Sequence, residues 1–239
     1  MPRPISSITI YTYGKKYDVA ASAFRAHGHS IVPTLVPVEL RESLLAEVTR
    51  AYCPGKTEKE RDGVIYVTAC PSMVSEAYQQ WMSGNRNHLP LNRLVSQMFE
   101  TASDVLESRD ELRCGPAQIA VRESGVPSPA PHIDGYSKNE PEPNTPRAIV
   151  GVYLTDVLDK GDGALMVWPG ERVAIANLRD ARRFDEAEKV AQACREGNAA
   201  CQLLLGAAGT IFIVDGNVPH ANAERTTDGK RIAVYLRVY

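Results

Sequence analysis

Two stretches in the first half of the chain carry apolar residues at the three- and four-residue spacing of an amphipathic helix. The first, residues 37–52, opens with a proline, which is favoured at the first position of a helix. Its apolar positions are Leu40, Leu44, Leu45 and Val48. The second stretch, residues 89–108, has apolar positions at Leu91, Leu94, Val95, Met98, Phe99 and Val105. We expect residues 18–107 to be mostly helical.

A third helical stretch, residues 179–198, is closed by Gly197 and is dense in charges of both signs. Such a mixture is typical of a solvated helix face. We therefore expect this helix to lie at the surface and to be mobile.

From residue 113 onward the chain consists of short runs rich in Val, Ile, Leu and Tyr, separated by Gly and Pro, which predicts strands. The predicted strands are 115–123, 147–157, 163–170, 201–206, 209–216 and 230–239. Because the helices come first and the strands follow, this order predicts an α+β fold, with helices packed on an antiparallel sandwich or barrel. A parallel α/β fold would need helices and strands to alternate.

Composition narrows the class of protein further. With 239 residues and 44% hydrophobic content, the chain is long enough for one large domain with a substantial core. The net charge of -2 provides no general basic field for nucleic acid or for anionic membranes. We see no signal peptide and no stretch of membrane-spanning length. The five cysteines, at 53, 70, 114, 194 and 201, include no CxxC and indicate reduced thiols in a cytoplasmic protein.

Candidate chemistry begins in PSPAPHIDGYS, residues 127–137, where His132 and Asp134 stand two positions apart. In extended backbone such positions project from one face, so both side chains could bind one metal ion. A His-x-Asp occurs by chance in about one such chain in four, so the tripeptide needs a further ligand. His220 is the candidate, since it follows a predicted strand and the turn-like DGNVP.

Eleven residues after His220, Arg231 opens the last predicted strand. The two-residue period places Arg231, Ala233, Tyr235 and Arg237 on one face, and Ile232, Val234, Leu236 and Val238 on the other. An arginine in a strand built for burial is costly unless it meets an anion. We expect Arg231 to meet an anionic ligand. The alternatives are an ion pair of Arg231 with Asp215 or Glu224, and Arg237 as the ligand-binding arginine.

Together these residues resemble the Fe(II)/2-oxoglutarate-dependent dioxygenases, in particular their phytanoyl-CoA dioxygenase-like branch. The resemblance covers about residues 114–239 and rests on HID at 132–134, GALMVWPG at 163–170, and the histidine and arginine at 220 and 231. The chain departs from the pattern at Glu171-Arg172, where relatives usually carry Ser-His, and at Asn222, where a small hydroxyl residue is common.

The resemblance implies a fold and a reaction. The fold is a double-stranded β-helix (a cupin-like jelly roll) in one domain, 1–239, with 1–112 as mainly helical support on the outside and 113–239 as the core with the metal site. The enzyme would use Fe(II), O2 and the co-substrate 2-oxoglutarate to oxidise a C–H bond of a small-molecule metabolite, most simply by hydroxylation, releasing succinate and CO2. Because Asp134 is present, the iron has no vacancy for halide, which argues against halogenation.

The resemblance also implies residue roles. The metal ligands are His132, Asp134 and His220. The 2-oxoglutarate contacts are Arg231, Gln118 and Tyr153, although Tyr153 could equally be a core residue. The substrate contacts are Arg122, Tyr136, Trp168 and Arg172. Residues 135–146 would form a lid because they are polar and proline-rich and directly follow the ligands.

Two other classes of protein remain open. A cupin-like metal-dependent isomerase or dioxygenase that does not use 2-oxoglutarate would keep the three ligands and have no use for Arg231. A non-catalytic jelly-roll binding protein would hold no metal at all.

Overall fold

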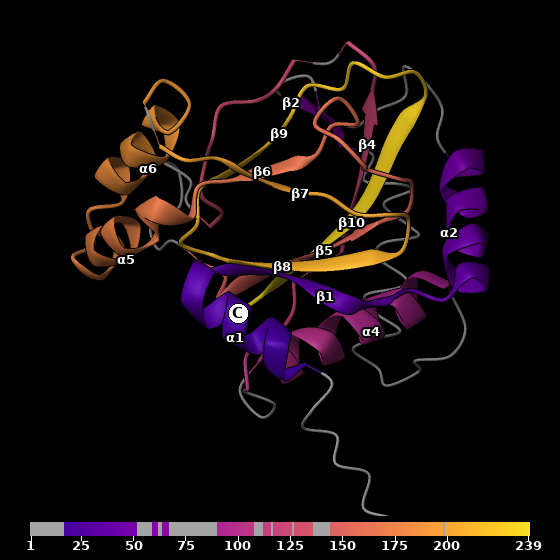
Figure 1. The fold of residues 1–239 in the computed structure, drawn as a ribbon, viewed down its shortest axis with the longest axis horizontal. Coiled ribbons are helices and arrows are strands. Elements are labelled where there is room, and N and C mark those ends of the chain that lie inside the picture. Colours follow the sequence, from indigo (N-terminus) through magenta and orange to yellow (C-terminus); the bar gives the residue numbers. More distant parts are fainter. Residues whose placement is uncertain are drawn as a thin grey trace, which may run out of the picture.

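The structure is a computed structural model in which residues 17–51, 59–61, 64–66, 90–107, 112–115, 117–125, 127–135, 144–197 and 199–239 are described. Its strands form two antiparallel sheets (Figure 1). The large sheet has seven strands in the order β1-β8-β5-β10-β4-β3-β2, and the small sheet has three in the order β7-β6-β9.

The strands of the large sheet are β1 (His29–Leu35), β2 (Lys59–Arg61), β3 (Val64–Tyr66), β4 (Gln118–Glu123), β5 (Ala148–Tyr153), β8 (Thr210–Asp215) and β10 (Lys230–Val238). Those of the small sheet are β6 (Leu165–Val167), β7 (Gln202–Leu204) and β9 (His220–Asn222). The helices are α1 (Asp18–His27), α2 (Val38–Ala51), α4 (Pro90–Val105), α5 (Arg172–Asp180) and α6 (Phe184–Ala193), with a short 3-10 helix at Pro169–Glu171.

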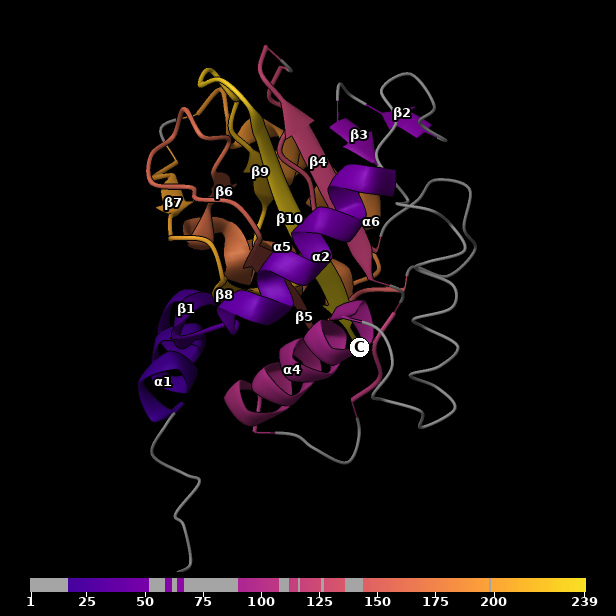
Figure 2. The same cartoon turned by 90° about the vertical axis from the view of Figure 1, so that its right-hand side faces the viewer.

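The large sheet has two apolar faces, which creates three layers. On β10, Ile232, Val234, Leu236 and Val238 pack in one cluster with α1, α2 and α4. Ala233 and Tyr235 face the other way and pack against the small sheet. Figures 1 and 2 show the three helices on the side of the large sheet that faces away from β6 and β7. The mainly β jelly-roll fold, with helices on its outside, therefore matches the expectation from the sequence.

A glycine allows the space between the two sheets to be filled. Gly151 of β5 lies between its register partners Phe212 of β8 and Tyr235 of β10. A Cβ atom at Gly151 would lie 2.0 Å from Cζ of Phe212, so the Phe212 ring occupies the position of the missing side chain. The Phe212 ring in turn contacts Tyr153, with ring centroids 4.8 Å apart. These aromatic rings pack between the two sheets.

The region before residue 112 is less helical than expected. Helices α2 and α4 lie where the apolar spacing predicted them. However, β1 falls within the stretch that was expected to be helical, and it pairs with β8, for example Ile31 with Phe212. The N-terminal region thus contributes β1, β2 and β3 to the large sheet as well as supporting helices.

The charged helix expected at 179–198 is also different. In the structure this stretch is divided between the end of α5 and the whole of α6. The two helices are separated at 181–183, where Arg182 has a left-handed backbone with a φ of 58°. Arg179, the last basic residue of α5, is buried with 7% exposure, so its part of the charged stretch is not a solvated face. Most other charged residues of this stretch are exposed or half-buried, as expected.

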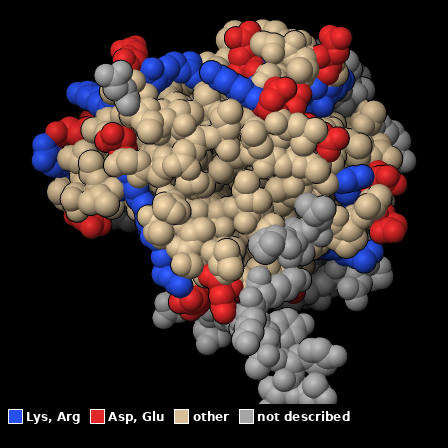
Figure 3. All heavy atoms as spheres, viewed as in Figure 1, with Lys and Arg blue, Asp and Glu red and all other residues tan. Residues whose placement is uncertain are grey.

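The described residues carry surface charges of both signs and three free thiols. On the face drawn in Figure 3, positive and negative side chains are mixed around the periphery. Among the described helices, none is both long enough and apolar enough to cross a bilayer. Cys114, Cys194 and Cys201 are free thiols, and burial raises the pKa of Cys114 and Cys194 to about 11. Cys53 and Cys70 lie outside the described residues.

Candidate metal centre

The segment that contains His132 and Asp134 lies along the free edge of β9. His132 and His220 form an antiparallel bridge in which each backbone N–H donates to the carbonyl of the other, both at 3.0 Å. Directly opposed residues in such a pair project their side chains from the same face. Asp134, two positions further along, projects from that face too. The backbone pairing therefore brings together three residues that are up to 88 positions apart in the chain.

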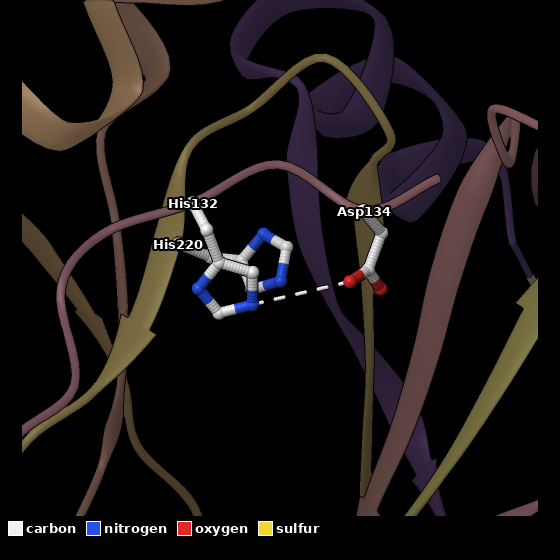
Figure 4. A group of neighbouring side chains, drawn as sticks. All are labelled: His132, Asp134 and His220. Carbon is white, nitrogen blue, oxygen red and sulfur yellow. Dashed lines mark ion pairs between the residues drawn. The ribbon is translucent and has the colours of Figure 1, made fainter. Parts of the chain in front are cut away.

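The three side chains converge on one point (Figure 4). One ligand atom from each of His132, Asp134 and His220 lies within 4.8 Å of the other two. Nε2 of His132 is 3.9 Å from Oδ1 of Asp134, and the two imidazole centroids are 4.6 Å apart. Among the described residues, this is the group of His, Cys, Asp and Glu side chains with the spacing of a metal site.

Backbone carbonyls orient both imidazole rings. Nδ1 of His132 lies 3.2 Å from the carbonyl oxygen of Ala130, and Nδ1 of His220 lies 3.2 Å from that of Val218. With the proton on Nδ1, each ring donates to its carbonyl and keeps the lone pair on Nε2 for a metal. The His132 side chain is 37% exposed and His220 is buried, so the centre is open to solvent on the His132 side.

The protonation states also suit a metal. Burial, followed by the neighbouring His132, lowers the pKa of His220 to about 4 despite the nearby Asp134. Burial would raise the pKa of Asp134, but the charges of His220 and Arg237 and the hydrogen bond from Arg237 lower it to about 2. At neutral pH the His220 side chain is therefore neutral and that of Asp134 is anionic, as a metal would require of them. Two histidines and a carboxylate leave positions open on an octahedral ion, as in non-haem Fe(II) oxygenases.

Arg237 holds the other oxygen of Asp134. Its Nε donates to Oδ2 of Asp134 at 2.7 Å, and its Nη1 donates to Oε1 of Gln118 at 3.2 Å. Oδ1 of Asp134 is the oxygen that faces His132. Gln118 therefore lies close to the candidate metal ligands, whereas Arg237, the alternative to Arg231, is engaged by the carboxylate of Asp134.

Arg231 lies on the same inner face of β10 and is fully buried, with 0% exposure. Its Nη1 donates to Oδ1 of Asn222 at 2.7 Å, to the hydroxyl of Tyr235 at 2.9 Å and to the carbonyl oxygen of Gly163 at 3.3 Å. Its Nε and Nη2 have no hydrogen-bond partner among the described residues. A buried guanidinium with two unpaired nitrogens has the chemistry of an anion site.

The ion-pair alternatives for Arg231 do not form in the described structure. Asp215 pairs with Arg172 instead, at 2.7 Å, and Glu224 forms no ion pair with any residue that the structure describes. Asn222, one of the departures from the family pattern, accepts a hydrogen bond from Arg231 and so helps to orient it. Neither Asn222 nor Tyr235 was predicted to be a site residue, although the period of the last strand already placed Tyr235 on the face of Arg231.

Two expected contacts have other roles in the structure. The Tyr153 hydroxyl donates to the carbonyl oxygen of Leu204 at 2.8 Å and accepts from the Leu165 N–H at 3.1 Å. It is thus a core residue that joins the two sheets, and its only proton is committed. Trp168, expected near the substrate, packs with Met166, Cys194, Ala221 and Ala223, a cluster separate from the one between the two sheets.

The expected substrate arginines are also engaged elsewhere. Arg122 is fully buried opposite Arg231 in the sheet register, and its Nη2 donates to the carbonyl oxygen of Pro127 at 2.6 Å. Arg172 pairs with Asp215 and lines a hollow of about 320 Å³ to which none of the three metal-ligand candidates contributes. Arg172 thus ties α5 to Asp215, away from the candidate metal ligands, whereas Arg122 lies beside Arg231 on the same face of the large sheet. Tyr136 and most of the expected lid 135–146 lie outside the described residues.

No family model and no curated protein sequence matches this chain. Solved structures match it over 92% of its length. The non-heme alpha-ketoglutarate-dependent epimerase SnoN from nogalamycin biosynthesis has a TM-score of 0.64 at 16% identity, with 81% of that chain covered. The carbocyclase SnoK of the same biosynthesis has a TM-score of 0.63 at 18% identity, with 83% covered. HygX from Streptomyces hygroscopicus, with nickel and 2-oxoglutarate bound, has a TM-score of 0.55 at 15% identity, with 86% covered.

At these identities the similarities establish the fold. The chain has the jelly-roll fold of non-heme enzymes that use alpha-ketoglutarate, another name for 2-oxoglutarate.

Proposed function

We propose that this protein is a non-haem Fe(II)- and 2-oxoglutarate-dependent oxygenase that oxidises a C–H bond of a small-molecule metabolite. One observation carries the proposal: three convergent side chains, His132, Asp134 and His220, share an interior with the fully buried Arg231, two of whose nitrogens have no hydrogen-bond partner among the described residues. The three convergent side chains fit a metal ion, and Arg231 fits a carboxylate.

His132, Asp134 and His220 would hold the iron. The Nε2 atoms and Oδ1 supply two neutral nitrogens and one charged oxygen, a donor set that suits Fe(II). When bound, the iron and 2-oxoglutarate supply oxidising power from O2, with release of succinate and CO2. Arg237 keeps Oδ2 of Asp134 engaged, so Oδ1 stays directed to the metal position.

Arg231 would hold the distal carboxylate of 2-oxoglutarate. Its contact residue Asn222 lies two positions after His220, about 7 Å along β9. That separation suits a short dicarboxylate whose other end reaches the metal. The planar fork of arginine can donate two hydrogen bonds to one carboxylate, and Asn222 and Tyr235 hold the fork in place. Gln118 would contact the metal-proximal end of the co-substrate, because it lies beside Arg237 and Asp134.

The two alternative classes explain less of the interior. A metal-dependent isomerase or dioxygenase without 2-oxoglutarate would use the three ligands but would leave Nε and Nη2 of Arg231 unpaired. A binding protein without metal would leave unexplained why backbone carbonyls orient both imidazoles so that their Nε2 atoms converge with Oδ1 of Asp134.

Hydroxylation is the outcome we propose, because it is the simplest oxidation that this centre can perform. Among the structural neighbours are an epimerase and a carbocyclase, so related centres also direct other outcomes. We further propose that the chain belongs to the phytanoyl-CoA dioxygenase-like branch, on its HID, GALMVWPG and H…R residues. We also propose that it works in the cytoplasm, on its odd number of cysteines and its lack of CxxC.

A succinate-release assay tests the proposal. The purified chain is incubated with Fe(II), 2-oxoglutarate and O2 against a panel of metabolites, next to His132→Ala and His220→Ala variants. We expect one or more metabolites to stimulate succinate formation in the wild type and in neither variant. Conversion of a panel metabolite that proceeds equally without 2-oxoglutarate would support the isomerase class instead.

A further inference from the structure

Helices α5 and α6 lie directly against the segment that contains two of the proposed ligands. In extended backbone, Ile133 projects away from the face used by His132 and Asp134. Its side chain is 3% exposed and packs with Ile175 of α5 and with Ala187 and Ala191 of α6. The residue between the two ligands is therefore anchored in the apolar contact between the two helices.

Arg179 of α5 connects both ligand-bearing segments. Its Nη2 donates to the backbone carbonyl of Asp134 at 2.5 Å. Its Nη1 donates to the carbonyl oxygen of Gly216 at 2.8 Å and to Oδ1 of Asn217 at 2.9 Å, in the loop that leads into β9 and His220. One guanidinium thus ties the Asp134 backbone to the loop before His220.

Burial of the Arg179 guanidinium would be unfavourable without compensating contacts. Burial of a guanidinium removes its hydration and must be compensated by acceptors. Neighbouring basic residues of the same stretch, such as Arg182 and Arg183, remain exposed. The three oxygens that Arg179 meets belong to the two segments that must be held at a fixed separation if their ligands are to share one ion.

A third contact holds the start of the first segment. Arg195, which follows α6, donates to the carbonyl oxygens of Ser128 at 3.1 Å and Pro129 at 2.5 Å. The hydroxyl of Ser128 donates to the carbonyl of Asn222 at 2.6 Å. The α5–α6 region therefore contacts the ligand segment before, between and at its ligands.

We propose that α5 and α6 form a platform that sets the separation of the metal ligands, with Arg179 and Ile133 as its positioning residues. This inference rests on the metal centre of the proposed function and is independent of 2-oxoglutarate. The three candidate ligand atoms lie within 4.8 Å of one another. Because ligand atoms around one ion must keep short, fixed distances from each other, small shifts of either segment should change the affinity for the metal. Loss of a residue that orients a ligand typically weakens metal binding by about 10- to 100-fold.

The test is an anaerobic titration with Co(II), which gives both a dissociation constant and a visible spectrum that reports ligand geometry. We expect Arg179→Gln and Ile133→Ala to weaken Co(II) binding by about 10- to 100-fold and to alter the spectrum. Arg179→Lys keeps the charge but loses the fork, so it should be intermediate. Arg179→Lys also keeps the test decisive if Arg179→Gln does not fold.

Two controls separate positioning from general destabilisation. Leu44→Ala removes a buried apolar side chain on α2, away from both segments, and should lower thermal stability while leaving the Co(II) constant and spectrum unchanged. Arg183→Gln removes an exposed arginine that pairs with Glu186, and it should leave both the Co(II) constant and the spectrum unchanged. Wild-type affinity and spectrum in Arg179→Gln and Ile133→Ala, or losses no greater than in Leu44→Ala, would overturn the platform alone. Failure of the wild type to bind Co(II) would overturn the metal centre itself.

Discussion

At the scale of single residues, the hydroxyl of Tyr153 joins three strands. The side chain belongs to β5, donates to Leu204 of β7 and accepts from Leu165 of β6. Its ring is fully buried beside Phe212. One oxygen thus satisfies a backbone donor and a backbone acceptor of the small sheet, so the residue contributes to stability more than to ligand recognition.

Tyr153→Phe tests this role. The change leaves a buried N–H and a buried carbonyl without this partner, which should lower the free energy of unfolding by about 1–3 kcal/mol, measured by urea denaturation. The affinity of the metal-loaded protein for 2-oxoglutarate should change by less than about twofold, since the hydroxyl proton is already committed. A large loss of 2-oxoglutarate affinity with unchanged stability would instead indicate that Tyr153 contacts the co-substrate.

The sequence could identify the important face of the last strand but not the role of each residue on it. The two-residue period places Arg231 and Arg237 on one face equally well. Their roles differ because Asp134 reaches Arg237 from a segment 103 positions away, while the acceptors that Arg231 meets among the described residues are neutral. Contacts of this kind depend on how distant segments pair, and no local pattern contains them. The sequence did not predict the burial of Arg179 either, because its acceptors also lie in distant segments.

At the scale of elements, β5 and β8 fit together because residue 151 has no side chain. The Phe212 ring fills the space next to Gly151, at 2.0 Å from the position a Cβ would take. We expect Gly151→Ala to force Phe212 off its position and to cost about 1–3 kcal/mol of unfolding free energy, the usual range for overpacking.

Gly170 provides the matched control for Gly151→Ala. No atom outside its chain neighbours lies within 4 Å of a Cβ added there, and its φ is not in the left-handed region. Gly170→Ala should therefore leave the denaturation midpoint nearly unchanged. Equal midpoints for the two variants would contradict the packing described for β5 and β8.

Elements with strong local patterns were predicted well, and those defined by distant partners were not. Helices α2 and α4 and strands β4, β5, β8 and β10 all fall within their predicted ranges. Strand β1 was missed because its short run becomes a strand through pairing with β8, about 180 positions later. The break between α5 and α6 was missed because it depends on the left-handed backbone of Arg182, a residue type with no preference for it.

At the scale of the whole molecule, the jelly roll brings two chemically different sites into one interior. The ligand segment pairs with one edge of β9, while Arg231 projects from β10 towards Asn222 at the end of β9. Strand β9 therefore links the metal position to the anion position through residues 220–222. The proposed function requires one small molecule to occupy both positions at once.

Calorimetric titration of 2-oxoglutarate into the anaerobic, Fe(II)-loaded protein tests that requirement most directly. We predict binding to the wild type, a loss of about tenfold to a few hundredfold in affinity for Arg231→Ala, and an intermediate loss for Arg231→Lys. Iron affinity should remain the same in all three. Arg41→Ala is the control, because Arg41 also donates to a backbone carbonyl, that of Ala208, but lies on α2. Equal 2-oxoglutarate affinities in the wild type and both Arg231 variants would contradict the role of Arg231, and no binding to the iron-loaded wild type would contradict the account as a whole.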